Sequence, residues 1–101
     1  MIVVEYDPKK GVSMPDAEIE NFVDTVILDH IKKGDEYLIV SNEMVISMFR
    51  VKIAEGSLQT ENIIFEFEGQ QLRATKAGRM EHWPKGFCDN FDFMLDRLLK
   101  I

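Results

Sequence analysis

Residues 36–42, EYLIVSN, give the clearest indication of the fold of this chain. The apolar centre of this run is short and ends in polar residues, which predicts a buried strand. A second run of the same kind, MIVVEY, opens the chain at residues 1–6. A helical pattern lies between the two runs. A helix that joins two buried strands forms a β-α-β unit, so the sequence predicts that these strands lie parallel in one sheet.

The joining segment predicts an amphipathic helix that follows Ser13 as N-cap and stops before Gly34. Pro15 in the first turn and Asp16, three residues after Ser13, are typical of a helix start. Gly34 can end the helix with a positive φ angle. The apolar stripe at i, i+3 and i+4 spacing, which we expect to be buried, consists of Ile19, Phe22, Val23, Val26, Ile27 and Ile31.

The second half of the chain predicts another helix, a hairpin and a last helix. The next helix is capped by Ser41 or Asn42 and stops at Gly56. Residues 62–68, NIIFEFE, alternate between apolar and polar positions, and residues 70–76 return after a turn at Gly69, as in an edge hairpin. A last helix is expected from Asp89. The prediction is one α/β (α+β) domain over residues 1–101, in the order β-α-β-α-β-β-α, with parallel first strands and a C-terminal edge hairpin packed by helices.

Composition limits the classes of function. Hydrophobic residues make up 46% of the 101 residues and charged residues 30%, which is ordinary for a globular domain. The net charge of −6 argues against direct binding of nucleic acid and leaves a basic partner protein possible, since acidic surfaces speed encounter with basic ones. No apolar run is long enough to span a bilayer, and the N-terminus carries no signal-peptide pattern. With a single cysteine, the expected compartment is the cytoplasm.

One polar cluster has a position that suggests binding. The carboxyl ends of neighbouring parallel strands are where open α/β sheets bind ligands. Here these ends carry Glu5, Asp7, Ser41, Asn42 and Glu43. The alternative is structural: Asp7 caps a turn, and Ser41 or Asn42 caps a helix. Because no phosphate-binding glycine motif occurs, we predict no cofactor, no metal and no catalytic residue.

Histidine and cysteine offer only weak alternatives. A zinc site needs about four ligands, and the candidates here are His30, His82 and Cys88. His30 falls at the edge of an apolar helix face and is expected to be a packed or partly exposed residue. A nucleophilic pair of Cys88 and His82, as in a small hydrolase, would lack a third group to orient it.

The stretch HWPKGF, residues 82–87, combines bulky apolar side chains with a constrained backbone. Its distinctive residues are Trp83, Pro84, Gly86 and Phe87. Such a stretch is suited to act as a clasp that locks the hairpin against the last helix. The alternative is a docking surface centred on Trp83, since tryptophan is a frequent interface anchor.

Several motifs together resemble a known family. HWPKGFCD, residues 82–89, fits the pattern W-P-x-G-F-x-D. LRATKAGRM, residues 72–80, is similar to a strand and turn of the type L-x-I-D-x-x-G-x-I. FRVKIAEGSLQTENIIFEFE, residues 49–68, is similar to R-x-x-I-x-E-G-x-L-x-P-E-D-V-x-I-x-F-F-E. In this order the motifs resemble the C-terminal lobe of predicted AAA/ABC-type ATPases of the RecF and OLD-nuclease kind.

The resemblance implies a lobe without ATPase activity. Glu5 would take the Mg-associated acidic position, but Tyr6 stands where active relatives have a catalytic glutamate. Ser41 replaces a histidine, while Glu43 keeps an acidic residue, and the phosphate loop is missing. We therefore expect a non-enzymatic interaction protein that binds a protein partner or its own copy. The alternative is a small acidic inhibitor or immunity-type protein that binds a basic toxin or nuclease.

Overall fold

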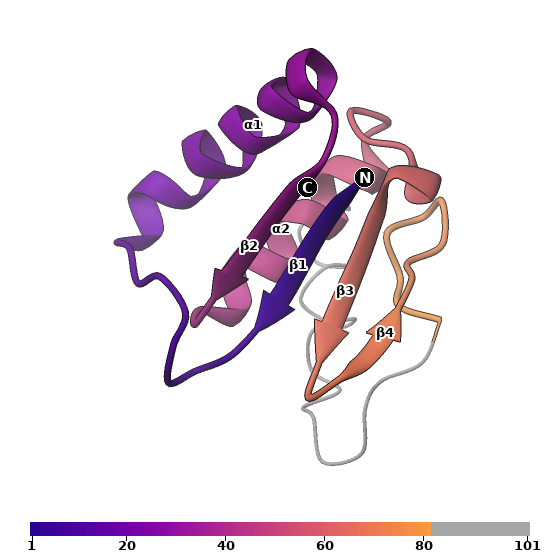
Figure 1. Ribbon diagram of the computed structural model, residues 1–101. Coiled ribbons are helices and arrows are strands. Elements are labelled where there is room, and N and C mark those ends of the chain that lie inside the picture. The colour runs from indigo at the N-terminus through magenta and orange to yellow at the C-terminus, as the bar shows by residue number, and fades with distance from the viewer. Residues whose placement is uncertain (82–101) are drawn as a thin grey trace.

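A four-stranded mixed sheet organises residues 1–81, the part of the chain that the computed structural model describes (Figure 1). The strands are β1 (Ile2–Tyr6), β2 (Glu36–Val40), β3 (Ile63–Phe67) and β4 (Gln70–Leu72), in the spatial order β2-β1-β3-β4. β1 pairs in parallel with both β2 and β3, and β4 pairs antiparallel with β3. The predicted α/β fold, with parallel first strands and a hairpin at the sheet edge, is confirmed.

Two helices connect the parallel strands. α1 (Asp16–Lys33) joins β1 to β2, α2 (Glu43–Ala54) joins β2 to β3, and a short 3-10 helix, η1 (Thr60–Asn62), leads into β3. α2 lies behind the sheet in Figure 1 and contacts β1, while α1 contacts α2 and β2. The last helix expected from Asp89 lies outside the described residues.

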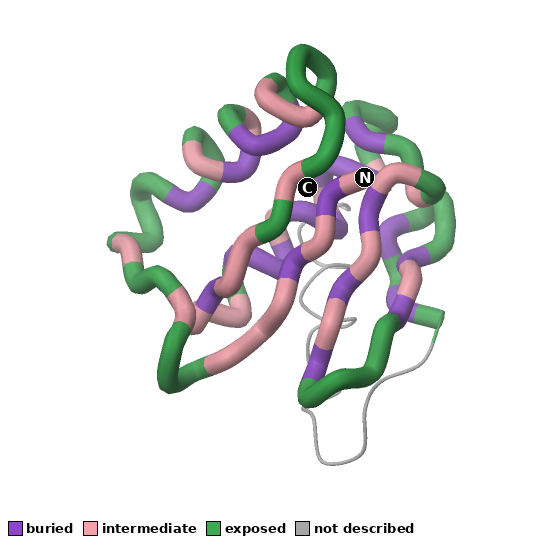
Figure 2. The backbone as a smooth tube through the Cα atoms, in the orientation of Figure 1, coloured by how far each residue is buried: buried purple, intermediate pink, exposed green. Residues whose placement is uncertain are grey.

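The core lies between the sheet and the two helices, α1 and α2. Buried and half-buried residues alternate along β1 and β3 (Figure 2), as the period of two in a strand requires. The buried strand residues are Ile2, Val4, Ile63, Phe65 and Phe67, and those of α2 include Val45, Ile46, Phe49 and Ile53. The alternation predicted for residues 62–68 is therefore confirmed.

The hairpin turn between β3 and β4 has two residues, Glu68 and Gly69. Their φ angles are +49° and +84°. Two positive φ angles in a two-residue loop match the twist of the strands that the loop connects. The turn predicted at Gly69 is confirmed, and its first residue is the unusual one, because glutamate rarely adopts this conformation.

The predicted start and outer face of α1 need correction. Ser13 is not the N-cap: the helix begins at Asp16, and Pro15 occupies the cap position without a side-chain hydrogen bond. Ile31 is 71% exposed instead of buried. The helix has 18 residues and is roughly 27 Å long, whereas a five-residue strand spans about 17 Å. The last turns of α1 therefore extend beyond the end of the sheet that could cover them.

β2 is also less buried than its sequence predicts. Only Val40 is fully buried, and Tyr37 is 60% exposed. The reason is topological, because the second crossover returns past β1 and leaves β2 at the edge of the sheet. An apolar run alone cannot distinguish an edge strand from a central one.

Candidate functional site

The predicted polar cluster is used mainly for local structure. Asp7 Oδ1 accepts hydrogen bonds from the backbone N–H groups of Lys9 and Lys10 at 2.9 and 3.1 Å, and these bonds lower the pKa of Asp7. Asn42 Oδ1 accepts the N–H of Met44 at 2.9 Å, so Asn42 caps α2. Both contacts are those of the structural alternative: a capped turn and a capped helix.

Ser41 is engaged by the loop that follows β1. Its hydroxyl donates to the carbonyl of Val12 at 3.2 Å, and the N–H of Val12 donates to the carbonyl of Ile39 at 3.0 Å. Gly11 lies against the end of β2 so closely that a Cβ atom would be 2.1 Å from the carbonyl carbon of Val40. The loop therefore covers part of the outer edge of β2, a packing role that the sequence analysis did not predict for Gly11.

Glu43 contacts Tyr6, the residue at the position where the resemblance predicts a catalytic glutamate in active relatives. The Tyr6 hydroxyl donates to Glu43 Oε1 at 3.4 Å, and burial together with the charge of Glu43 raises the pKa of Tyr6. A phenol with a raised pKa remains neutral at pH 7 and is a poor base. Within residues 1–81, no group of three His, Cys, Asp or Glu residues is placed to hold a metal ion. The pair therefore has structural rather than catalytic chemistry.

Glu5 is separated from Glu43, because Glu5 lies on the face of the sheet opposite the Tyr6–Glu43 pair. We call this side of the sheet the open face. Two rows of side chains cross it: the first is Tyr37, Val3 and Ile64, and the second is Ile39, Glu5 and Glu66. Apart from the exposed Tyr37, these residues are partly buried. In the described part of the chain, both helices contact elements on the opposite side, where the core residues lie.

The electrostatics of the open face are dominated by two adjacent carboxylates. Glu5 and Glu66 are register partners on neighbouring strands, which lie about 4.8 Å apart. The Tyr37 hydroxyl donates to Glu5 Oε1 at 2.7 Å, and this bond, with the charges of Glu5 and Glu66, raises the pKa of Tyr37. The open face thus carries an apolar row beside an acidic pair.

The sequence also contains an indication that one face of the sheet is open. Glu5 and Glu66 occupy outward positions in two strands that are otherwise apolar. Charged residues at such positions indicate that the face is not sealed by a helix of the same domain. The crossover between β2 and β3 determines which strands are neighbours. It therefore also determines that the two glutamates lie side by side.

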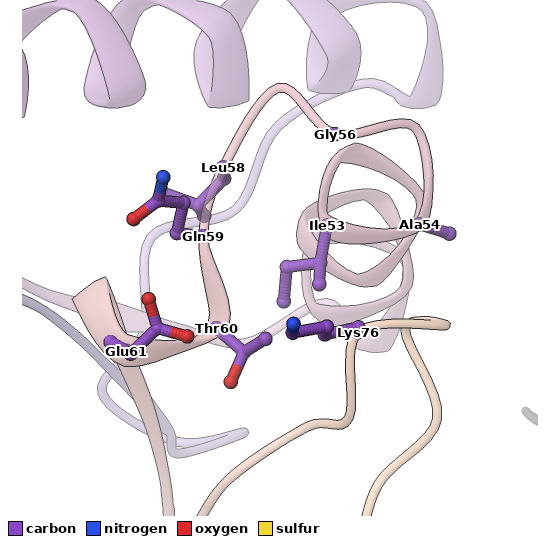
Figure 3. A pocket seen from close by; sticks show the side chains of 8 residues that line it. All are labelled: Ile53, Ala54, Gly56, Leu58, Gln59, Thr60, Glu61 and Lys76. Carbon is purple, nitrogen blue, oxygen red and sulfur yellow. The ribbon is translucent and has the colours of Figure 1, made fainter.

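A pocket opens at the carboxyl end of α2 (Figure 3). It has a volume of about 320 Å³ and is lined by Ile53, Ala54, Gly56, Leu58, Gln59, Thr60, Glu61 and Lys76. Figure 3 shows Lys76 pointing toward Thr60 over the side of Ile53. Among residues 1–81, no histidine or cysteine lines it. It offers apolar contacts with a charged rim but no activated nucleophile.

A second cleft, of about 360 Å³, lies at the carboxyl ends of β1 and β3. Its lining consists of Glu5, Tyr6, Asp7, Pro8, Lys9, Glu68 and Gly69. This is the place where the resemblance implies a magnesium-associated carboxylate. Two of its acidic groups, on Glu5 and Asp7, already accept hydrogen bonds from within the chain.

The remaining candidates have no catalytic geometry in the described residues. His30 Nδ1 lies 2.6 Å from the carbonyl oxygen of Gly34 at the end of α1, where it helps to close the helix. His82, Cys88 and the four residues of the proposed clasp, Trp83, Pro84, Gly86 and Phe87, lie outside the described residues. In residues 1–81, no helix has the length and apolar character needed to cross a membrane.

Comparison of the chain with protein-family models, with curated proteins and with solved structures finds no match.

Proposed function

We propose that this chain is a non-enzymatic, cytoplasmic interaction protein, similar to a degenerate C-terminal lobe of an ATPase, that binds a protein partner through the open face of its sheet. The proposal is supported by the motifs that resemble that lobe and by the use of its polar strand ends for capping. Tyr6 at the place of the catalytic glutamate supports it further.

The observation that carries the proposal is a parallel sheet with one face that no helix of residues 1–81 covers. Parallel strands occur almost entirely in sheets that are covered on both faces. Here β1, β2 and β3 are parallel, yet Tyr37 is 60% exposed on the face opposite the helices. Val3, Ile39 and Ile64 share that face and are only partly buried. A protein partner would supply the second layer that such a sheet normally has.

A second candidate function is a small acidic inhibitor or immunity-type protein that binds a basic toxin or nuclease. The acidic pair Glu5 and Glu66 at the centre of the open face favours it, together with the net charge of −6. Both candidates use the same surface and differ in the identity of the partner.

Affinity capture from an extract of the native host tests the use of this surface. The bait is the full chain, and the test variant is Ile39→Thr/Ile64→Thr, which makes the open face polar. The control is Leu28→Thr/Ile31→Thr, which removes the same kind of apolar surface from exposed positions on α1. We expect the control to retain the partner and the test variant to lose it, with similar melting temperatures for both.

A partner retained equally by the two variants would contradict the proposal. Where the partner is lost only with the test variant, its identity separates the two candidates. A partial ATPase supports the first function, and a basic toxin or nuclease supports the second.

A further inference from the structure

We propose that the open face binds a basic segment of a different protein, in which a lysine or arginine contacts Glu5 and Glu66 and neighbouring apolar side chains cover Tyr37, Val3 and Ile64. This inference rests on the proposed function and specifies the chemistry of its partner.

Within residues 1–81, the acidic pair has no cationic partner. Glu5 and Glu66 face each other across neighbouring strands, where like charges destabilise a sheet. Tyr37 donates to Glu5 Oε1, but a carboxylate has two oxygens and several acceptor sites. No ion pair joins either glutamate to a lysine or arginine of residues 1–81. A cation placed between the two carboxylates would relieve their repulsion and donate to the acceptor sites that residues 1–81 leave unused.

The apolar row explains why a protein segment fits better than a small cation. Tyr37, Val3 and Ile64 form a strip directly beside the acidic pair. Apolar side chains laid over this strip would remove water from the neighbouring carboxylates and strengthen their attraction to a cation. A segment that combines a lysine or arginine with flanking apolar residues contacts the acidic pair and the apolar row at the same time.

A second copy of the chain is not complementary in charge to this surface. In a two-fold interface the same patch lies on both sides. The Glu5–Glu66 pair of one copy would then face the same pair of the other, and each copy carries a net charge of −6. The charge pattern therefore points to a basic partner of different sequence.

Selection from a library of random 12-residue peptides displayed on phage, against the immobilised full chain, tests the inference. We expect the selected peptides to contain lysine or arginine between apolar residues and to shift the backbone amide signals of β1, β2 and β3 in NMR titrations. Affinity should fall by about tenfold or more for Glu5→Gln/Glu66→Gln. It should be unchanged for Glu18→Gln/Glu55→Gln, which neutralises two exposed glutamates on or next to the helices.

The outcomes separate this inference from the function on which it rests. Peptides without basic residues that bind the open face, and that bind Glu5→Gln/Glu66→Gln equally well, overturn the inference but leave the proposed function standing. Peptides that bind elsewhere and ignore Ile39→Thr/Ile64→Thr overturn both. A wild-type chain that self-associates through the open face, or one that selects no peptide, also overturns the inference.

Discussion

The contact between Gly78 and Arg50 fixes the position of the loop after β4. Arg50 is fully buried in α2, and its Nε donates to the carbonyl of Gly78 at 2.7 Å. Gly78 has a φ of +81° and closes a small hairpin in which Thr75 N–H donates to the Arg79 carbonyl. A Cβ atom on Gly78 would lie 2.4 Å from the carbonyl oxygen of Arg50. The loop can therefore approach the helix only through a glycine.

Replacing Gly78 with alanine should destabilise the protein by roughly 2 to 4 kcal/mol, because it combines a strained φ angle with a clash against helix backbone. Gly56→Ala is the matched control, since Gly56 has a φ of +85° but no atom within 4 Å of the added Cβ. It should cost only about 1 kcal/mol. Urea unfolding of both variants measures the difference, and equal costs would show that the close approach to Arg50 carries no energy.

Residue roles could be predicted where they depend on near neighbours in sequence. The turn at Asp7 and the cap at Asn42 are set by side-chain oxygens that bond N–H groups two or three residues ahead. Gly11 and Gly78 are different, because each is required by a segment far away in sequence. A single sequence shows that a glycine is present but not what lies against it.

At the scale of elements, Lys52 links the two helices. Its ammonium group, on α2, lies 2.8 Å from Glu20 Oε2 and 3.1 Å from Asp24 Oδ1, both on α1. The Lys52 side chain is 10% exposed, whereas those of Glu20 and Asp24 are 61% and 47% exposed. The hydrogen bond to Glu20 is the largest cause that raises the pKa of Lys52.

We expect Glu20→Gln and Asp24→Asn each to cost about 0.5 kcal/mol, because the other carboxylate still pairs with Lys52 and water screens the exposed partner. The double variant should cost on the order of 2 kcal/mol, since the buried ammonium then lacks both carboxylates. Chemical unfolding of the singles and the double gives the coupling between them. Glu18→Gln/Asp29→Asn on the same helix is the control, and strictly additive costs would exclude a shared ion pair.

The pH dependence of this contribution has a definite sign. In the folded state, the hydrogen bond to Glu20 raises the pKa of Lys52 above its ordinary value of 10.5. Its stabilisation is therefore fully present below that pH and is lost as pH rises through the folded pKa. The difference in stability between the wild type and the double variant should stay constant from neutral pH upward and narrow only above about pH 10.5.

Element type was predictable from periodicity, whereas element environment was not. The alternation in β3 and the helical spacing in α1 are local patterns, and both gave the correct element. The exposure of Ile31 and Tyr37 depends on where the sheet ends, and no repeat within α1 or β2 records that boundary.

At the scale of the whole molecule, the open face arises from the arrangement of the crossovers. The predicted β-α-β unit indicated a layered domain, but it did not reveal that the core of residues 1–81 would form on one side of the sheet. The same arrangement brings Glu5 and Glu66 together from strands about 60 residues apart in the chain. The candidate site is therefore a property of topology, while the predicted cluster at the strand ends was a property of local sequence.

The geometry of the strand ends leads to a final prediction about nucleotide binding. Phosphate binding in this kind of fold needs backbone N–H groups that are free to point at the ligand. Here the N–H groups of Lys9 and Lys10 donate to the Asp7 side chain, and that of Met44 donates to the Asn42 side chain. The Val45 N–H donates to the backbone carbonyl of Asn42. A phosphate would have to displace these bonds in a cleft that already contains carboxylates.

We therefore expect isothermal titration of the full chain with Mg-ATP to show no binding at micromolar concentrations. Asp7→Ala/Asn42→Ala is the informative companion variant, because it releases the N–H groups of Lys9, Lys10 and Met44 without adding a positive charge. Binding gained by that variant would show that capping alone excludes the phosphate, and its absence would show that the acidic surroundings exclude it as well. Micromolar binding by the wild-type chain would contradict the non-enzymatic proposal, since an occupied nucleotide site would then exist beside Tyr6 and Glu43 despite their hydrogen bond.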